Sequence, residues 1–428
     1  MVDFRPFRAI RYDTAEAGRM DDLICPPYDV INPSQERALR ARNPHNMVRL
    51  ELAEIQGAPS PTRYADASAT FQRWQASGVL RRDERPAYYL VRQRFTHEGA
   101  TRDRFAIFGA LRLEELGNEV LPHEHTAAGP KQDRLALMEV CKANFSPIMM
   151  LFRDAGRQVA ALRERVTARH PEQTFTGDDG QGYAAWRIDD PADTSVVRQA
   201  LAGQKAYIAD GHHRYETALT YRDAHAADGE AAGFVMTCLI DFDDPGLLIL
   251  PYHRVLRGLS DAQFEYLRDR IAQIFLTEKA GVDLTSHRPL EAIVAKVGER
   301  GPAFGLVGQG GEGPYLLTVG NAALIDKYAP RGPENAVKDV EAWILQEVLL
   351  RPVLGDDFPS FVTYVHDGAE ALSLVKDGTG QMAFFLKGVP PDIFETVVGM
   401  GVRLPRKSTY FHPKLPSGVV INSLSGSL

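Results

Sequence analysis

Short apolar runs alternate with helical stretches along this chain, and that alternation restricts the folds it can adopt. The longest runs, over 234–240 and 247–250, fall well short of the roughly 20 residues that a membrane-spanning helix requires. We expect them to be buried strands. Because helices of ordinary length separate several of the runs, the sequence predicts an α+β fold, or an α/β fold with a mixed sheet, in which mixed sheets are flanked by helices.

The predicted elements are spread along the whole chain. Helices are expected over 33–42, 63–78, 132–142, 159–168, 212–226, 261–275, 290–300 and 337–350. Strands are expected over 88–95, 104–113, 146–152, 205–208, 233–242, 303–307, 315–319, 361–365 and 382–386. The first helix has a clear start signal, because Asn32 suits the N-cap and Pro33 suits the first helical position. The glycine-rich stretch at 307–314 lies between two strands, which favours a hairpin loop over a phosphate loop, since a phosphate loop needs a helix after it.

The length of 428 residues suggests two or three domains. Changes in composition divide the chain into an N-terminal segment at 1–86 that packs on the core, a central α/β domain at 87–257 and a C-terminal α+β domain at 258–428. The last part is expected to contribute a basic segment to the site.

Charge and cysteine content exclude several classes of function. The chain has 49 Lys and Arg against 56 Asp and Glu, a formal net charge of −7, which argues against a general nucleic-acid binder because such proteins need clustered cations. The three cysteines are far apart and form no C-x-x-C pair, so neither a disulfide framework nor a thiolate zinc site is indicated. The N-terminus carries charge and proline where a secretory signal needs an apolar stretch. We therefore expect a cytoplasmic protein with a small-molecule partner and no membrane or nucleic-acid partner, whose oligomeric state stays open.

The most informative stretch contains the run Ile-Ala-Asp-Gly-His-His-Arg. It predicts a strand ending at Asp210, a tight turn at Gly211 and a helix that starts within one or two residues. The N–H groups at a helix start favour an anion, and His212, His213 and Arg214 add donors there, so the pattern predicts a phosphate site. In the alternative interpretation Asp210 only caps the helix, the histidines lie on its surface and Arg214 pairs with an acidic neighbour.

A second polar stretch is the loop that leads into the helix predicted at 132–142. It offers a ligand the side chains of His123, Glu124, His125, Lys131 and Arg134. His123 and His125 could instead bind a metal together with His212 or His213, since imidazole is a common metal ligand, and spacing leaves this open. A solvated loop is the third interpretation.

Two further stretches carry candidate residues. A basic run near the C-terminus combines cations with two hydroxyls, which suits a phosphate but also suits a solvent-facing tail; its residues are Arg403, Arg406, Lys407, Ser408, Thr409 and Lys414. Near the N-terminus, two prolines impose an extended path before Tyr28 and Asp29. Such a path can hold an active-site carboxylate, but it equally suits a buried entry strand.

Four stretches together resemble the domain-of-unknown-function 1015 family of bacteria and archaea. They are Cys25-Pro-Pro-Tyr-Asp-Val30, the His123-Glu-His-Thr loop with Gly129-Pro-Lys131 and Asp133-Arg134, Asp210-Gly-His-His-Arg214, and Pro405-Arg-Lys-Ser-Thr-Tyr-Phe411. In the central segment, the strand followed by Asp-Gly-His-His-Arg is similar to the signature of the ParB and sulfiredoxin-like fold. In that fold the turn holds nucleotide phosphates, and one branch comprises free serine kinases. This looser likeness implies phosphate contacts at Gly211, His212, His213 and Arg214. Members of the family are often associated with serine-biosynthesis genes, which implies serine or phosphoserine as the substrate.

These observations predict a phosphoryl-transfer enzyme that acts on a small hydroxyl-bearing metabolite, with serine or O-phosphoserine as the expected substrate. It would be a nucleotide-dependent kinase or a phosphoserine phosphatase, and Mg²⁺ with ADP or ATP are the expected cofactors. Phosphoryl transfer needs positioning and positive charge more than covalent chemistry. The cations expected to neutralise the phosphate, besides the helix start, are Lys131, Arg134, Arg406 and Lys407.

The general base is expected to be Asp210, with Glu216 and Glu124 as alternatives, because a base must lie within reach of its proton. A phosphatase variant would use His212 or His213 as the nucleophile. Two other hypotheses stay open: a non-catalytic nucleotide or phosphometabolite-binding regulator at the same site, and a metal-dependent hydrolase that uses His123, His125 and His212.

Overall fold

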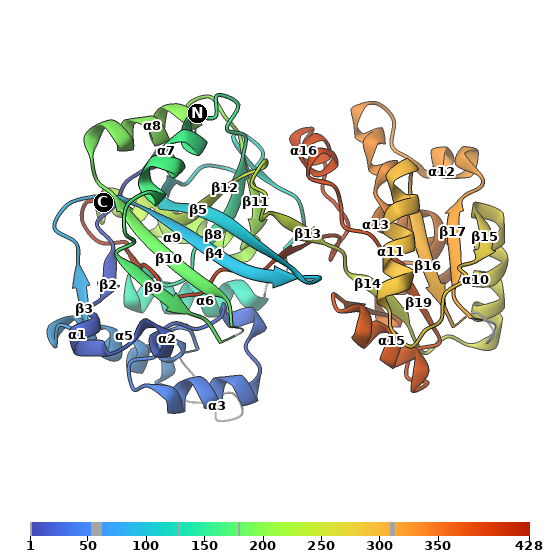
Figure 1. Ribbon diagram of the computed structural model, residues 1–428, viewed down its shortest axis with the longest axis horizontal. Coiled ribbons are helices and arrows are strands. Elements are labelled where there is room, and N and C mark those ends of the chain that lie inside the picture. The colour runs from blue at the N-terminus through green and yellow to red at the C-terminus, as the bar shows by residue number, and fades with distance from the viewer. Residues whose placement is uncertain (1, 53–61, 127–128, 179, 309–312) are drawn as a thin grey trace. The chain divides into compact units, whose positions relative to one another are not determined.

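The computed structural model divides the chain into two compact units (Figure 1). It describes residues 2–52, 62–126, 129–178, 180–308 and 313–428. Unit 1 comprises Met1–Leu247 and Pro413–Leu428, and unit 2 comprises Leu248–His412. This division differs from the three expected parts, because 1–86 belongs to unit 1, the first boundary follows Leu247, and the last residues return to unit 1.

Strand pairing accounts for the return of the C-terminal residues to unit 1. The strand β21 (Asn422–Ser423) pairs with β7 (Ala143–Asn144). Isolated bridges join Ile421 to Ile10 and Ser417 to Cys25. Because these partners are far from 413–428 in sequence, the chain pattern alone does not reveal them.

Unit 1 is built on a nine-stranded sheet. Its strands, in spatial order, are β6 (Val120–Pro122), β11 (Ala206–Asp210), β8 (Ile148–Phe152), β12 (Phe234–Asp241), β5 (Ala100–Arg112), β4 (Tyr88–His97), β10 (Gly182–Ile188) and β9 (Gln173–Thr176), and β1 (Phe4–Arg5) pairs with β5. The pairs β11–β6 and β12–β8 are parallel, whereas the other pairs of this sheet are antiparallel. The predicted class, mixed sheets flanked by helices, is therefore confirmed.

Helices stack outward from this sheet. Helix α9 (His212–Ala224) packs on β8 and β12, α6 (Gly129–Cys141) packs on α9, and α5 (Arg63–Ala76) packs on α6. Tyr215, Ala218 and Tyr221 of α9 are buried at helical spacing, which gives the helix its apolar face. The remaining helices of unit 1 are α1 (Thr14–Ala17), α2 (Met20–Leu23), α3 (Pro33–Arg42), α4 (Val48–Glu51), α7 (Gln158–Thr167) and α8 (Pro191–Leu201). The predicted start of α3 is confirmed, because Asn32 and Gln35 form a capping box.

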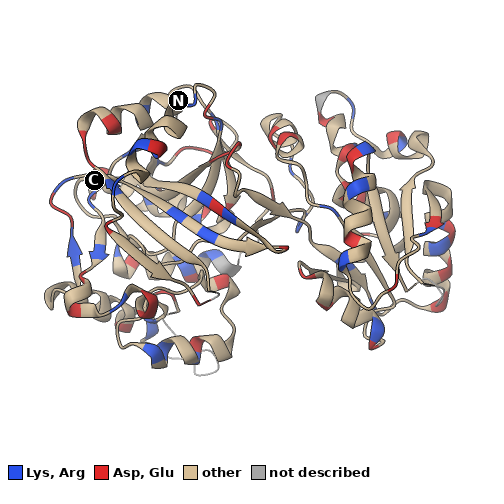
Figure 2. Cartoon of the chain, viewed as in Figure 1, with Lys and Arg blue, Asp and Glu red and all other residues tan. Residues whose placement is uncertain are grey.

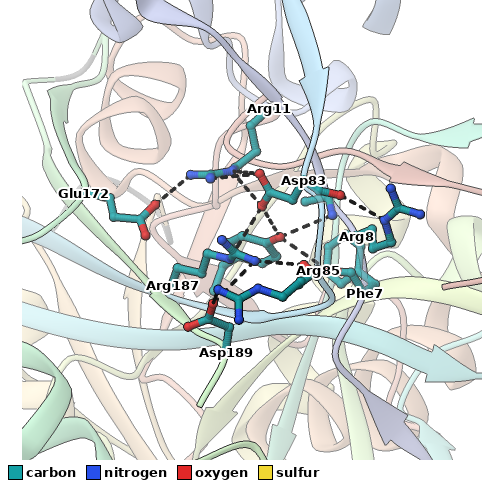
Figure 3. Close-up of polar contacts among 10 residues, drawn as sticks. Phe7, Arg8, Arg11, Asp83, Arg85, Glu172, Arg187 and Asp189 are labelled. Atoms are coloured by element: carbon teal, nitrogen blue, oxygen red, sulfur yellow. Dashed lines mark hydrogen bonds and ion pairs between the residues drawn. The ribbon is translucent and has the colours of Figure 1, made fainter. Parts of the chain in front are cut away.

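A charged cluster ties the N-terminal segment to the sheet of unit 1 (Figure 3). Asp83 follows β3 (Leu80–Arg82), which pairs with β2 (Ile10–Tyr12). Its carboxylate accepts hydrogen bonds from Arg11 Nη2 at 2.9 Å and from the Tyr89 hydroxyl at 2.6 Å. Burial and the neighbouring Asp83 raise the pKa of Tyr89, so this hydroxyl stays protonated and donates. The cluster therefore fixes where residues 8–12 meet β4.

Unit 2 contains a six-stranded sheet in which every pair is antiparallel. Its strands, in spatial order, are β15 (Phe275–Lys279), β17 (Tyr315–Val319), β16 (Ala303–Val307), β19 (Met382–Leu386), β14 (His253–Leu256) and β18 (Val362–Val365). Helices α11 (Arg288–Val297) and α15 (Gly368–Lys376) cover one face, where Leu290 and Leu372 pack against Ala383 and Phe385. Further elements of this unit are α10 (Asp261–Ile274), α12 (Ala322–Tyr328), α16 (Pro391–Gly399) and the ribbon of β13 (Leu248–Leu250) with β20 (Tyr410–His412).

Two sequence predictions for unit 2 have different outcomes. The hairpin is confirmed, because β16 pairs directly with β17, although residues 309–312 of its loop lie outside the described residues. The single helix over 337–350 is wrong. A 3₁₀ helix (Pro333–Asp339) ends before Val340, which is extended, and α13 (Glu341–Trp343), a π-helix (Ile344–Leu350) and α14 (Arg351–Leu354) follow. The extended backbone of the β-branched Val340 breaks the helical path that the apolar spacing predicted.

Among the helices whose residues the structure describes, none is both long and apolar enough to cross a membrane. The three cysteines are free and buried. Lys and Arg are interspersed with Asp and Glu in each unit (Figure 2), so charge alone does not single out a site, and individual contacts have to identify it.

Candidate functional site

The predicted strand–turn–helix unit is confirmed at the junction of β11 and α9. β11 ends at Asp210, Gly211 has a φ of 98°, and α9 starts at His212. This left-handed backbone favours glycine, and a Cβ on Gly211 would lie 3.1 Å from the guanidinium of Arg214. The turn therefore depends on glycine both for its dihedral angles and for the space beside Arg214.

Asp210 lies at the centre of an ion-pair network. Arg214 Nη2 is 2.5 Å from Asp210 Oδ2, and Lys414 Nζ is 3.0 Å from Asp210 Oδ1. Lys414 also contacts Asp29, and the other arm of Arg214 donates to the carbonyl of Pro147. Burial alone would raise the pKa of the Asp210 carboxyl, but Lys414 and Arg214 outweigh it and hold that pKa well below its usual range.

This network argues against two predicted roles. A carboxylate that two cations keep ionised is a weak base, so Asp210 is poorly suited to take a proton from a substrate. Arg214 is buried and directs its guanidinium to Asp210 and a backbone carbonyl, as in the alternative in which it pairs with an acidic neighbour. These two residues organise the turn.

Two buried histidines meet beside the turn. The backbone N–H of His123 donates to His212 Nε2 at 3.2 Å, and His123 Nδ1 is 2.7 Å from the carbonyl of Ile208. The two imidazole rings meet edge to face, with 4.5 Å between their centroids. Because His212 Nε2 accepts a hydrogen bond, the neutral ring carries its proton on Nδ1, and Nδ1 lies 3.4 Å from Glu124 Oε1.

The orientation of His212 changes its predicted role. A ring nitrogen that accepts a backbone hydrogen bond is not available for attack on phosphorus, which argues against a phosphohistidine at His212. The Glu124 side chain is 31% exposed, so its carboxylate is accessible to a ligand while His212 orients it from the buried side. Glu124 is therefore a better candidate base than Asp210.

The helix α6 supplies further charges to the same region. Lys131 forms an ion pair with Glu216 of α9, which also accepts a hydrogen bond from the hydroxyl of Thr126 at 2.7 Å. The buried Arg134 bonds Glu51, with Nη1 2.9 Å from its carbonyl and 3.3 Å from its carboxylate. The Arg134 guanidinium also lies 4.2 Å from the centre of the Tyr28 ring.

Comparison with known proteins identifies the family. The model of the family described as "Protein of unknown function (DUF1015)" matches residues 4–345. The chain belongs to this family. No match is found among the curated proteins.

Several solved structures are distantly similar to this DUF1015 chain. A conserved hypothetical protein from Pyrococcus furiosus is 14% identical, with a TM-score of 0.34, over 73% of this chain and 93% of that one. A free serine kinase variant in complex with ADP is 14% identical, with a TM-score of 0.35, over 72% of this chain and 90% of that one. SbnI from Staphylococcus aureus, with a C-terminal truncation, is 11% identical, with a TM-score of 0.34, over 72% of this chain and 85% of that one.

The structure brings most of the predicted residues of unit 1 together. The residues in contact around the start of α9 are His123, Glu124, Lys131, Asp210, Gly211, His212, Arg214 and Glu216. Arg134 lies on α6 two residues beyond the first turn and binds Glu51 instead. His213 is partly buried in the first turn of α9, whereas His125 is exposed.

The predicted basic run is divided between the two units. Lys414 belongs to unit 1, whereas its other members, Arg403, Arg406, Lys407, Ser408 and Thr409, belong to unit 2. Within unit 2, Lys407 Nζ lies 4.9 Å from the centre of the Tyr252 ring, and the buried Ser408 hydroxyl donates to the carbonyl of Pro405 at 2.6 Å. A shared phosphate-binding site that includes these residues stays a prediction.

Asp29, Glu51 and Ser417 are site residues that the sequence did not favour. Asp29 contacts Lys414, and the Ser417 hydroxyl donates to Glu51 Oε1 at 2.6 Å. The rigid Cys-Pro-Pro-Tyr-Asp stretch was the available signal for Asp29. Glu51 and Ser417 lie in ordinary-looking sequence, so only the fold reveals their contact.

The arrangement of the histidines gives no support to the metal-dependent hydrolase. In the described part of the chain, no three His, Cys, Asp or Glu side chains are grouped so as to hold a metal ion. Both ring nitrogens of His212, one of the three predicted ligands, already face protein atoms, namely the N–H of His123 and Oε1 of Glu124.

Proposed function

We propose that unit 1 catalyses phosphoryl transfer to or from a small hydroxyl-bearing metabolite, with serine and O-phosphoserine as the first candidates and an adenine nucleotide as the phosphate donor or acceptor. One observation carries the proposal. Three segments far apart in the sequence bring an accessible carboxylate, Glu124, and a buried cation, Lys414, to the start of the same helix, α9.

The start of α9 suits a phosphoryl group. The first N–H groups of a helix have no acceptor within the helix, and its dipole favours negative charge there. Lys131 and Lys414 bring ammonium groups from α6 and from the C-terminal segment, each paired with carboxylates of the same network. Phosphoryl transfer depends on such positioning and charge rather than on a covalent protein intermediate.

Glu124 is the proposed general base in the kinase direction. It would take the proton of the substrate hydroxyl as that oxygen forms its bond to phosphorus and the bond from phosphorus to the nucleotide oxygen breaks. His212 donates from Nδ1 toward Glu124 Oε1 and so orients the carboxylate. In the reverse direction, Glu124 returns the proton to the leaving alkoxide.

A magnesium ion would be carried chiefly by the nucleotide phosphates, and the partly exposed carboxylate of Glu124 could supply an oxygen donor to it. Mg²⁺ prefers such donors and keeps several waters while it binds nucleotide phosphates. When bound, it would neutralise charge on the transferring group. The residues of this chain then have to orient the acceptor hydroxyl and exchange its proton.

Phosphorus NMR tests the proposal directly. The protein is incubated with O-phosphoserine and Mg²⁺, with and without AMP or ADP. Phosphate that moves to the nucleotide supports a reversible kinase, and free phosphate without nucleotide supports a phosphatase. Saturable nucleotide binding without any product would favour the non-catalytic regulator instead.

The variant Glu124→Gln keeps the shape of the side chain and removes the base. We expect turnover to fall about 100-fold or more, the usual contribution of a general base. Glu115→Gln is the matched control, because Glu115 is 73% exposed and pairs with Arg222. If Glu124→Gln turned over substrate as fast as Glu115→Gln, Glu124 would not be the base.

A further inference from the structure

The chain enters and leaves unit 2 beside the same stretch of β5. Before the chain leaves unit 1, Asp244 Oδ2 accepts a hydrogen bond from the N–H of Phe105 at 3.1 Å. Gly246 then lies so close that a Cβ on it would be 2.7 Å from the Cα of Arg104. Where the chain returns, Arg104 donates to the carbonyl of Pro413. β5 therefore contacts both connections between the units, the segment before unit 2 and the segment after it.

Arg104 is the central residue of these contacts. Its side chain is almost completely buried, with 1% relative exposure, and its Nη2 donates to Gln93 Oε1 at 2.5 Å as well as to Pro413. Gln93 Nε2 donates in turn to the carbonyl of Lys414 at 3.2 Å. The two carbonyls that flank the Cα of Lys414 are thus held from β4 and β5.

A buried guanidinium is expensive to desolvate, and burial lowers the pKa of Arg104. An apolar side chain of similar volume would avoid that cost. What it could not do is donate to the two acceptors that Nη2 of Arg104 bonds, Gln93 Oε1 and the carbonyl of Pro413, because it has no N–H group. The hydrogen bonds of Arg104 hold the backbone next to Lys414, directly at Pro413 and through Gln93 at Lys414 itself.

We infer that Arg104 is a positioning residue that, together with Gln93, sets the backbone at 413–414 so that Lys414 Nζ reaches Asp210 and Asp29. Arg104 acts through Lys414 and takes no part in the reaction itself. A displaced ammonium would leave Asp210 with Arg214 as its remaining cation in this network. The role of Lys414 in turnover rests on the proposed function, whereas its placement does not.

Lysine labelling measures that placement without any assumption about activity. The full-length protein is treated with acetic anhydride near pH 8, and peptide mass spectrometry follows the labelling rate of Lys414. In the native protein the carboxylates of Asp210 and Asp29 raise the pKa of Lys414 against the effect of burial, so it stays protonated and reacts slowly. We expect Lys414 to react at least about tenfold faster in Arg104→Met, a tenfold change corresponding to about 1.4 kcal/mol, while Lys142 and Lys338 react unchanged.

Arg254→Met is the matched control variant. Arg254 is a buried arginine of unit 2 that also donates to two backbone carbonyls, those of Tyr252 and Lys407. It should leave the labelling of Lys414 unchanged. Equal labelling of Lys414 in the native protein and in Arg104→Met would overturn the inference.

A second variant covers the case in which Arg104→Met does not fold. Arg104→Lys keeps the charge, but the lysine side chain is one bond shorter and its ammonium falls short of the position of Nη2. It should therefore also speed the labelling of Lys414, and an unchanged rate would overturn the inference equally. Kinetics separate this inference from the proposed function. If the native protein shows no phosphoryl transfer, the function fails while the labelling result stands. If the native protein does catalyse phosphoryl transfer, the Arg104 variants should lower kcat more than they raise KM.

Discussion

The two units use buried positive charge differently. In unit 1, Arg214 and Lys414 pair with Asp210 and Asp29, carboxylates that come from segments far apart in the sequence. In unit 2, Arg254 donates to the carbonyls of Tyr252 and Lys407, and the largely buried Lys387 pairs with a single carboxylate, that of Glu341. Bonds from a cation to backbone carbonyls hold a chain in place, whereas a group of cations and carboxylates at a helix start also forms a binding surface. The comparison explains why the candidate site is assigned to unit 1.

The largest expected effect comes from removing the cation that joins the distant segments. Lys414→Met leaves Asp210 and Asp29 without that cation, and we expect kcat/KM for phosphoryl transfer to fall at least about 100-fold, as when one preorganised donor is lost. The NMR assay described above measures it.

The matched variant in unit 2 is Lys387→Met. Lys387 is also largely buried, and its Nζ lies 2.5 Å from the carbonyl of Gly298 and 3.4 Å from Glu341. It should destabilise unit 2 and leave kcat/KM within about twofold. Equal losses of activity in the two lysine variants would remove the functional difference between the units.

The pH dependence of unit 2 gives a second comparison. Burial raises the pKa of the Glu341 carboxyl from its ordinary 4.5 to about 7, although Lys387 opposes the shift. Because the folded state binds this proton more tightly, the contribution to stability is full below pH 4.5 and is lost as the pH rises toward and through 7. Between pH 5 and 8 unit 2 should lose about 2 to 3 kcal/mol from this group.

Hydrogen exchange followed by mass spectrometry can measure this loss, since it reports on each unit separately. Glu341→Gln should abolish the difference in opening free energy between pH 5 and 8 that the peptides of unit 2 report. The opening free energies of unit 1 should stay unchanged. The pKa shift of Asp210 has the opposite direction. Its lowered pKa stabilises unit 1 at neutral pH, and that contribution is lost only as the pH falls below the ordinary pKa of an aspartate. A variant that kept the native pH dependence would show that Glu341 does not titrate in this range.

The smallest expected effect concerns the helices that carry the site. His225 joins α9 to α6, with its Nδ1 2.8 Å from Asp228 and its Nε2 2.7 Å from Glu139. These two carboxylates raise the pKa of His225, so the stabilisation is present below the ordinary histidine pKa and is lost as the pH rises through the raised value. Because the pair is near the surface, His225→Gln should lower Tm by only about 1 to 3 °C at pH 6. By pH 9 the native protein and the variant should melt together, and a persistent gap there would point to packing on Tyr221 instead.

Local signals predicted the framework of the site well. The run around Asp210 and Gly211 predicted the strand, the turn and the helix start, because all three depend on neighbouring residues. The same signals failed at Val340, whose extended backbone divides the predicted helix. They also could not distinguish the roles of Asp210 and Glu124, since the basicity of a carboxylate depends on which cations the fold brings to it, and Lys414 comes from the far end of the chain.

The two-stranded ribbon at the base of unit 2 has a consequence for how this chain could change over time. Leu248 and His412, the first and last residues of unit 2, are direct partners in β13 and β20. An inserted module whose two ends lie side by side can be lost, gained or exchanged in one genetic event, because a tight turn can close the gap in the host chain. Pro413 and Lys414 begin immediately after that junction, so a chain shortened in this way would still carry the lysine that its site requires.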